Sequence, residues 1–171
     1  MKSPVEWLTD DEYVNATPPT RALAWADSYV GQREIGHNRG PFVTMLLKAV
    51  GLGPGYPWCA SLVSWCIRQA GSNAGPKKGR AAVRNWFAWA RQESRTVDKA
   101  HARRGDLFLW VNPNGTGHIG FVAQIEDRQG GYWMRTIAGN TNDRNSREGD
   151  GVYKKEMWVD PKIRFVRWFG K

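Results

Sequence analysis

The feature that most constrains the fold is a change of hydrophobic periodicity near residue 103 of this 171-residue chain. Before this point, apolar side chains recur at helical spacing. After it, they alternate as they do in strands. Helices followed by strands predict an α+β fold, with N-terminal helices packed on a C-terminal antiparallel β-sheet. The length suits one domain with a sizeable core.

Breaker residues set the expected boundaries. We treat residues 1–19 as an N-terminal extension, with a short helix capped at Thr9, and residues 20–171 as the main domain. Further helices are expected at 20–30, from Pro41 to a stop at Gly51, at 59–70 and around 82–90. Expected strands span Asp106–Val111, His118–Glu126, Tyr132–Ala138, Gly151–Trp158 and Ile163–Phe169.

Net charge favours an anionic partner. The chain has 25 Lys and Arg against 16 Asp and Glu, a formal charge of +9. Nucleic acid, an anionic membrane and the bacterial cell wall all fit that charge. No nucleic-acid-binding motif is present, so we expect none as a partner. No apolar run reaches transmembrane length and no signal peptide is visible, so we expect synthesis in the cytoplasm followed by release or export through another route.

One cysteine lies where a reactive thiol is expected. Cys59 follows a loop rich in glycine and proline and begins the clearest helical pattern. The unpaired N–H groups and positive dipole at a helix start favour a thiolate. Cys66 lies seven residues on, about 10 Å away along the helix, which is too far for a disulfide. Both thiols should be free, and Cys66 should serve packing.

His118 is the best-placed base. It enters an expected strand, where His118, Gly120 and Val122 share one face. A glycine two residues after the histidine leaves room for a helix to approach that face. A strand histidine bonded only to a neighbour is the plainer alternative. His37 and His101 lie in polar or basic segments and are expected to be solvated.

Hairpin arithmetic brings Asn140 beside His118. If the two strands pair through a turn at 127–130, Glu126 lies opposite Gly131 and His118 opposite Gly139. A loop one residue wider sets His118 opposite Asn140, whose amide oxygen can accept the imidazole N–H. A simple turn role for Asn140 remains open. Weaker candidates for the same orienting role are Asn142 and Asp143.

The motifs PWCASLVSW, GDLFLW, GHIGFV and TIAGNTN, with NRGPFV upstream, resemble the CHAP family of cysteine, histidine-dependent amidohydrolases/peptidases. The resemblance spans roughly residues 20–170. It implies a papain-like α+β fold related to NlpC-type enzymes, and hydrolysis of amide bonds in peptidoglycan. Its nucleophile maps to Cys59, its base to His118 and its orienting residue to Asn140. Two departures are Ala138, where many members have glutamate, and Arg104, where many have proline.

The implied chemistry is acyl transfer through Cys59, with His118 as acid and base. The Cys59 backbone N–H and Tyr56 are expected to hold the oxyanion, and Trp58 to contact substrate. No cofactor or metal is implied, and two cysteines with three histidines make a poor zinc set. We expect a monomer.

Several readings stay open at this point. The enzyme could be an N-acetylmuramoyl-L-alanine amidase or a peptide endopeptidase, because both use the same groups. A catalytically inactive wall-binding module and a thiol acyltransferase are the alternatives from other classes. The setting could be a phage endolysin, or a secreted antibacterial toxin with an immunity protein.

Overall fold

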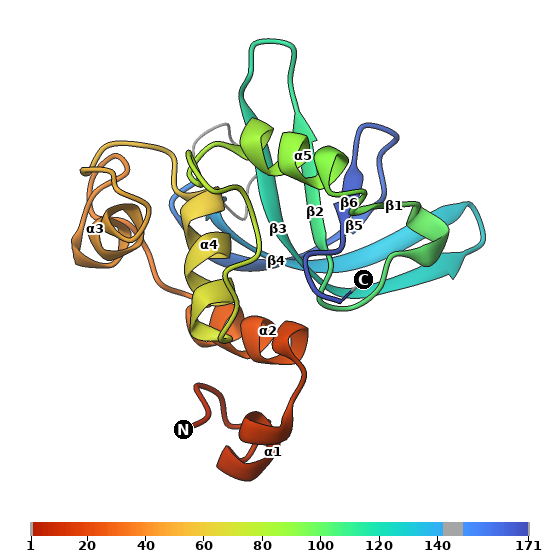
Figure 1. Ribbon diagram of the computed structural model, residues 1–171, viewed down its shortest axis with the longest axis horizontal. Helices are drawn as coiled ribbons and strands as arrows, with labels where there is room; N and C mark the ends of the chain where they lie inside the picture. The colour runs from red at the N-terminus through yellow and green to blue at the C-terminus, as the bar shows by residue number, and fades with distance from the viewer. Residues whose placement is uncertain (1, 142–148, 171) are drawn as a thin grey trace.

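The computed structural model describes residues 2–141 and 149–170, and within them five α-helices accompany one six-stranded antiparallel sheet, on which α2, α4 and α5 pack (Figure 1). This confirms the predicted α+β class. The helices are α1 (Asp10–Asn15), α2 (Pro18–Ser28), α3 (Pro41–Lys48), α4 (Cys59–Gln69) and α5 (Val83–Gln92). The strands are β1 (Thr96–Val97), β2 (Leu107–Val111), β3 (Gly117–Arg128), β4 (Gly131–Thr141), β5 (Gly151–Trp158) and β6 (Arg164–Val166), in the order β1-β6-β2-β3-β4-β5.

Helix starts follow local chemistry. Thr9 and Glu12 form a complete capping box at α1, as predicted. The predicted start of the second helix at Thr20 is wrong, because α2 begins at Pro18 after an N-cap at Thr17. The fixed φ of proline suits the first helical turn, which explains the earlier start.

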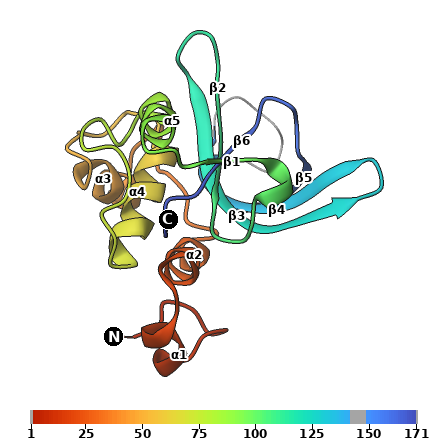
Figure 2. The ribbon, with the colours of Figure 1, turned by 45° about the vertical axis from the view of Figure 1, so that its right-hand side comes forward.

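Helix α4 anchors the core. Its buried face joins one hydrophobic cluster with sheet residues that include Leu109, Ile119, Phe121 and Ile137. Figure 2 shows α3, α4 and α5 gathered on one side of the sheet. We call this side the helix face. The opposite side, called the far face, has its own smaller cluster, which contains Phe108, Val122, Met134, Ala138, Ile163 and Phe165.

The hairpin β3–β4 differs from the predicted turn. The strands pair as far as Arg128 opposite Gly131, which leaves a two-residue loop instead of the expected four-residue turn. A bulge between Val122 and Gln124 then shifts the register, and Phe121 lies opposite Ile137. The paired residues of β3 and β4 end at Phe121 and Ile137, so neither predicted partner of His118 is reached and the placement of Asn140 opposite it stays a prediction.

The N-terminal segment docks on α2. Tyr13 is completely buried, and its hydroxyl accepts a hydrogen bond from the indole N–H of Trp25 at 2.6 Å. In the described part of the chain, no helix is both long enough and apolar enough to cross a membrane.

Candidate active site

Cys59 is the first residue of α4, as its position after the breaker-rich loop predicted. Trp58 is the N-cap, and the Cys59 side chain is nearly buried, with 4% of its surface exposed. The backbone of Ile119 in β3 lies close enough to the Cys59 sulfur to act on the pKa of the thiol, which it lowers. The thiol therefore lies against the start of β3, one residue from His118.

The ionisation of Cys59 differs from the expected thiolate. Burial raises the pKa of the Cys59 thiol to about 11, although hydrogen bonds from the backbone of Ile119, Ala60 and Cys59 itself act in the opposite direction. A helix terminus contributes only about half a charge, and its effect is smaller than the cost of removing a thiolate from water. The thiol is neutral at pH 7 in this conformation.

The imidazole of His118 lies on the far face of the sheet. Its ring centroid is 5.0 Å from that of Trp110 and 6.0 Å from that of Phe108. The prediction that Gly120 makes room there for a helix is wrong. A Cβ on Gly120 would meet the side chains of Ala138 and Phe108, each at 2.7 Å, because α4 packs against Ile119 and Phe121 on the other face.

The pKa of His118 is also displaced. Burial lowers it to about 4, and the positive charge of Lys155 adds to the effect. Imidazolium is therefore disfavoured at neutral pH, and His118 is a neutral base. Cys59 and His118 are therefore both neutral in this conformation, whereas the helix start predicted a thiolate at Cys59.

Asn140 occupies a strained position at the end of β4. Its φ is +52°, a left-handed conformation that costs non-glycine residues about 1 kcal/mol or more. The register with β5 shifts between Ala138 and Thr141, so Asn140 lies at a second bulge. Bulges re-aim side chains beside functional sites, and strain held at one position favours a functional role for its side chain.

The predicted site residues lie near the ends of three neighbouring elements. Cys59 is the first residue of α4, His118 is the second residue of β3, and Asn140 is the last residue but one of β4. Within residues 2–141, no hydrogen bond joins the side chains of any two of these three. Asn142 and Asp143 lie outside the described residues. The joint action of Cys59, His118 and Asn140 in one site therefore stays a prediction.

Trp58 and Tyr56 differ sharply in exposure. Trp58 is completely buried, and its indole N–H donates to the carboxylate of Glu34 at 3.0 Å. A Cβ on Gly139 would meet the Trp58 ring at 2.5 Å, so this glycine admits the indole beside Asn140. Tyr56 is 54% exposed in the loop before α4. Trp58 therefore packs beneath the site, and Tyr56 is free to face a ligand.

Two neighbours of the site escaped sequence reasoning. Glu34 holds Trp58, and Lys155 acts electrostatically on His118. Alternation along β5 places Tyr153, Lys155 and Met157 on one face of that strand. The sequence does not show that this face lies toward His118, because that depends on the register between β4 and β5. At the departure noted in the sequence, Ala138 lies opposite Tyr153, whose hydroxyl donates to Asp150 at 2.7 Å.

The described residues contain no cluster of three or more histidine, cysteine, aspartate or glutamate side chains that could hold a metal ion. Both cysteines are free thiols, as predicted from their spacing, and Cys66 is completely buried.

Comparison with known proteins agrees with this arrangement. The CHAP domain family model matches residues 51–140, which include Cys59, His118 and Asn140. Among solved structures, RipD of Mycobacterium tuberculosis, described as a non-catalytic NlpC/p60 domain protein adapted to peptidoglycan binding, is 15% identical. It gives a TM-score of 0.52 over 90% of this chain and 99% of its own.

The P60 domain of the antigen MAP1204 from M. avium subspecies paratuberculosis is 14% identical. Its TM-score is 0.51, over 90% of this chain and 96% of that domain. No curated protein matches. At these identities the two solved structures support the fold alone.

Proposed function

Because this chain belongs to the CHAP domain family, we propose that it hydrolyses an amide bond in peptidoglycan, with Cys59 as nucleophile, His118 as base and Asn140 as the residue that orients His118. The observation that carries the proposal is the match of the CHAP family model to residues 51–140, which include Cys59, His118 and Asn140. The Cys59 thiol lies at the start of α4, beside the backbone of Ile119 in β3.

The neutral state of both groups defines the first step. His118 accepts the proton of the Cys59 thiol as the sulfur attacks the amide carbonyl, so the thiolate is generated only when substrate is present. The backbone N–H of Cys59 is suited to hold the oxyanion. His118 then gives its proton to the leaving amine. Water, deprotonated by His118, releases the acyl group as a carboxylate and restores the thiol.

This sequence requires a movement of the His118 side chain. In the free protein its ring lies against Trp110, and no hydrogen bond reaches Cys59. Catalytic hydrogen bonds are often long or absent without substrate and form in the substrate complex. Asn140 is suited to accept the imidazole N–H in the paired state, at the price of its strained backbone.

Trp58 acts in this proposal as a positioning residue. Its ring lies between α4 and Gly139, and its indole is fixed by Glu34. Trp58 precedes Cys59 in the chain and packs against Gly139, the residue before Asn140. In this role it sets the distance between the nucleophile and the orienting residue. The exposed side chain of Tyr56 is suited to contact substrate.

A second candidate function is peptidoglycan binding without catalysis, which is how RipD is described. The specific observation in its favour is that Cys59 and His118 are unpaired and neutral. A binder of this kind would still bind to sacculi after its thiol is alkylated, and it would show no turnover at any pH.

Where the protein acts, and in which biological setting, follow from the proposed hydrolysis of peptidoglycan. A wall hydrolase acts outside the cytoplasm, as a phage endolysin or as a delivered antibacterial toxin. The charge of +9 would help it remain on an anionic wall. An immunity protein is required only by the toxin setting.

The test is release of new amines from purified sacculi by wild type, Cys59→Ala and Cys66→Ala. We expect Cys59→Ala to lose turnover and keep its fold. Cys66→Ala is the matched control, since Cys66 is a buried thiol of the same helix with no role in the proposal. Full activity in Cys59→Ala would reject the thiol mechanism, and inactivity of the wild type would favour the non-catalytic binder.

A further inference from the structure

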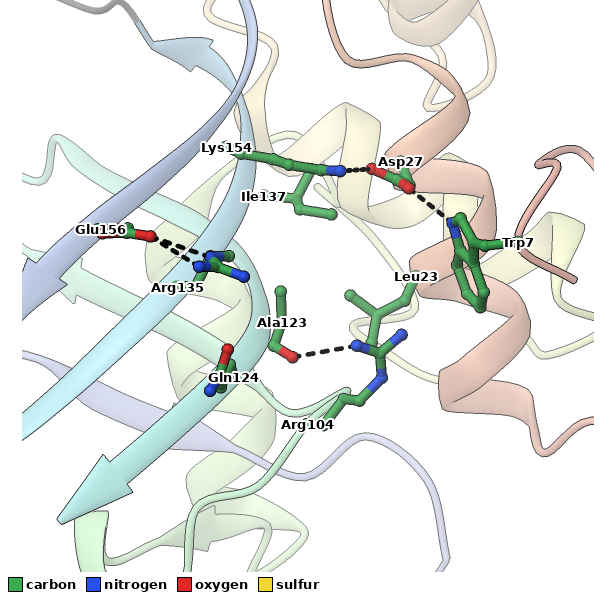
Figure 3. A pocket seen from close by; sticks show the side chains of 10 residues that line it. All are labelled: Trp7, Leu23, Asp27, Arg104, Ala123, Gln124, Arg135, Ile137, Lys154 and Glu156. Atoms are coloured by element: carbon green, nitrogen blue, oxygen red, sulfur yellow. Dashed lines mark hydrogen bonds and ion pairs between the residues drawn. The ribbon is translucent and has the colours of Figure 1, made fainter.

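A cavity lies on the helix face of the sheet, away from His118. It has a volume of about 660 Å³ and lies between the N-terminal segment, α2 and strands β3 to β5. Leu23, Ala123 and Ile137 supply its apolar surface, with five charged side chains and Trp7 around them (Figure 3). Its size falls in the range of small-ligand sites.

The charged groups of this cavity are arranged unequally. Asp27 is 2.5 Å from the Lys154 ammonium and also accepts the indole N–H of Trp7 at 2.7 Å. Glu156 accepts hydrogen bonds from Arg135. Both carboxylates are therefore engaged by protein cations.

Arg104 is the cation without such a partner. Its guanidinium donates to the carbonyl of Ala123 at 3.2 Å and lies 5.5 Å from the centre of the Trp7 ring. Among residues 2–141 and 149–170, no carboxylate pairs with it. Figure 3 shows the guanidinium reaching between β3 and the Trp7 ring. A ligand carboxylate is the group that this position lacks.

Trp7 is fixed although it is exposed. Nearly half of its surface, 46%, is accessible, yet its indole is held by Asp27 and its ring by Arg104. A large ring that is already immobilised loses little entropy when a ligand packs on it. Aromatic side chains of this kind suit the apolar face of a sugar or an aliphatic side chain.

We propose that this cavity binds an uncrosslinked muropeptide, with the terminal carboxylate of its peptide at Arg104 and its apolar portions on Trp7 and Ile137. The proposal rests on the proposed peptidoglycan function for its substrate class. Asp27 and Glu156 would repel a polyanion and can accept N–H or O–H groups of a muropeptide. A second contact to the same polymer raises the local concentration of the active site on the wall.

The experiment measures binding of a disaccharide-tetrapeptide by calorimetry, in a Cys59→Ala background that prevents turnover. We expect Arg104→Gln to weaken binding about tenfold, which is the scale of one charge-assisted hydrogen bond. Amidation of the terminal carboxylate should weaken binding to the parent protein equally and have no effect on Arg104→Gln. Trp7→Ala should also weaken binding.

The matched control is Arg128→Gln. Like Arg104, Arg128 is stacked on a tryptophan, which is Trp133. Unlike Arg104, it is bonded to a carboxylate, that of Glu126, and it does not line the cavity. It should bind as the parent does. Equal binding by Arg104→Gln and Arg128→Gln would overturn the proposal, as would an amidated ligand that binds undiminished. Competition by inorganic phosphate as strong as that by the muropeptide would overturn the peptide source.

This outcome is separable from that of the hydrolase. If the wild type cleaves sacculi but Arg104→Gln binds normally, the cavity proposal fails alone. If the wild type cleaves nothing but the Arg104→Gln effect is present, the hydrolase fails and the cavity proposal stands.

Discussion

The buried corner at Cys59 and His118 and the cavity beside Trp7 treat polar groups in opposite ways. At the corner, Cys59 is buried and His118 is partly buried, and both groups are neutral and make no hydrogen bond to each other. In the cavity on the helix face, charged side chains stay near solvent and bind one another. Burial thus removes charge where a reaction would occur, and exposure keeps it where a polymer would be held.

The largest expected effect at the buried corner is that of His118→Ala. Loss of the base should lower kcat/KM on sacculi by about a thousandfold. His101→Ala is the control, since this histidine is exposed in the 3-10 turn Lys99–His101. Rates of muropeptide release measure both. Retention of activity by His118→Ala would remove the base from the mechanism.

Asn140→Gly separates an orienting role from a structural one. Because Asn140 has φ +52°, glycine relieves backbone strain and should raise the free energy of unfolding by up to about 1 kcal/mol. Activity should nevertheless fall about ten- to a hundredfold, because the amide is lost. Asn140→Ala should lose activity and also stability. A fully active Asn140→Gly would reduce Asn140 to a turn residue.

Acid should destabilise the protein through His118. Its pKa is lowered to about 4 in the folded state and is near 6.5 when unfolded. Between these values the unfolded chain binds a proton that the folded chain excludes, so this contribution is complete above pH 6.5 and is lost toward pH 4. The loss should reach up to about 3 kcal/mol.

Urea unfolding of wild type and His118→Gln between pH 7 and pH 4 measures this contribution. The variant should lose less stability over that range, and His101→Gln should follow the wild type. Parallel curves for wild type and His118→Gln would show that burial does not shift the pKa of His118, and the contrast between the buried corner and the cavity would then be lost.

The last prediction tests the packing beneath the site. A Cβ on Gly139 would meet the Trp58 ring at 2.5 Å, so Gly139→Ala should destabilise the fold by about 1–3 kcal/mol and lower activity. Gly53→Ala is the control, because nothing lies within 4 Å of its Cβ position. Thermal unfolding and turnover should change together in Gly139→Ala alone.

Much of the fold follows from local signals. The start of α4 at Cys59 was predictable from the loop that precedes it, and β5 was predicted to the residue. The two-residue strand β1 was missed, because so short a segment has no periodicity. Each of these elements depends on the residues next to it in sequence.

The position of each candidate site residue along the chain followed from the sequence, but its burial and side-chain surroundings did not. The Val122–Gln124 bulge decides where Asn140 lies, and bulges carry no clear sequence mark. The choice of helix face was also missed, because β3 has apolar residues on both sides, with Ile119 on one and Val122 on the other. Burial, which decides the pKa values of Cys59 and His118, depends on packing between distant segments.

The most direct test of the central claim is digestion of purified sacculi in H₂¹⁸O, followed by mass spectrometry of the muropeptides. Thiol-dependent hydrolysis predicts products with one new amine and one ¹⁸O in the new carboxylate for wild type and Cys66→Ala, and none for Cys59→Ala. Unchanged sacculi after wild-type digestion, or the same labelled products from Cys59→Ala, would contradict the account.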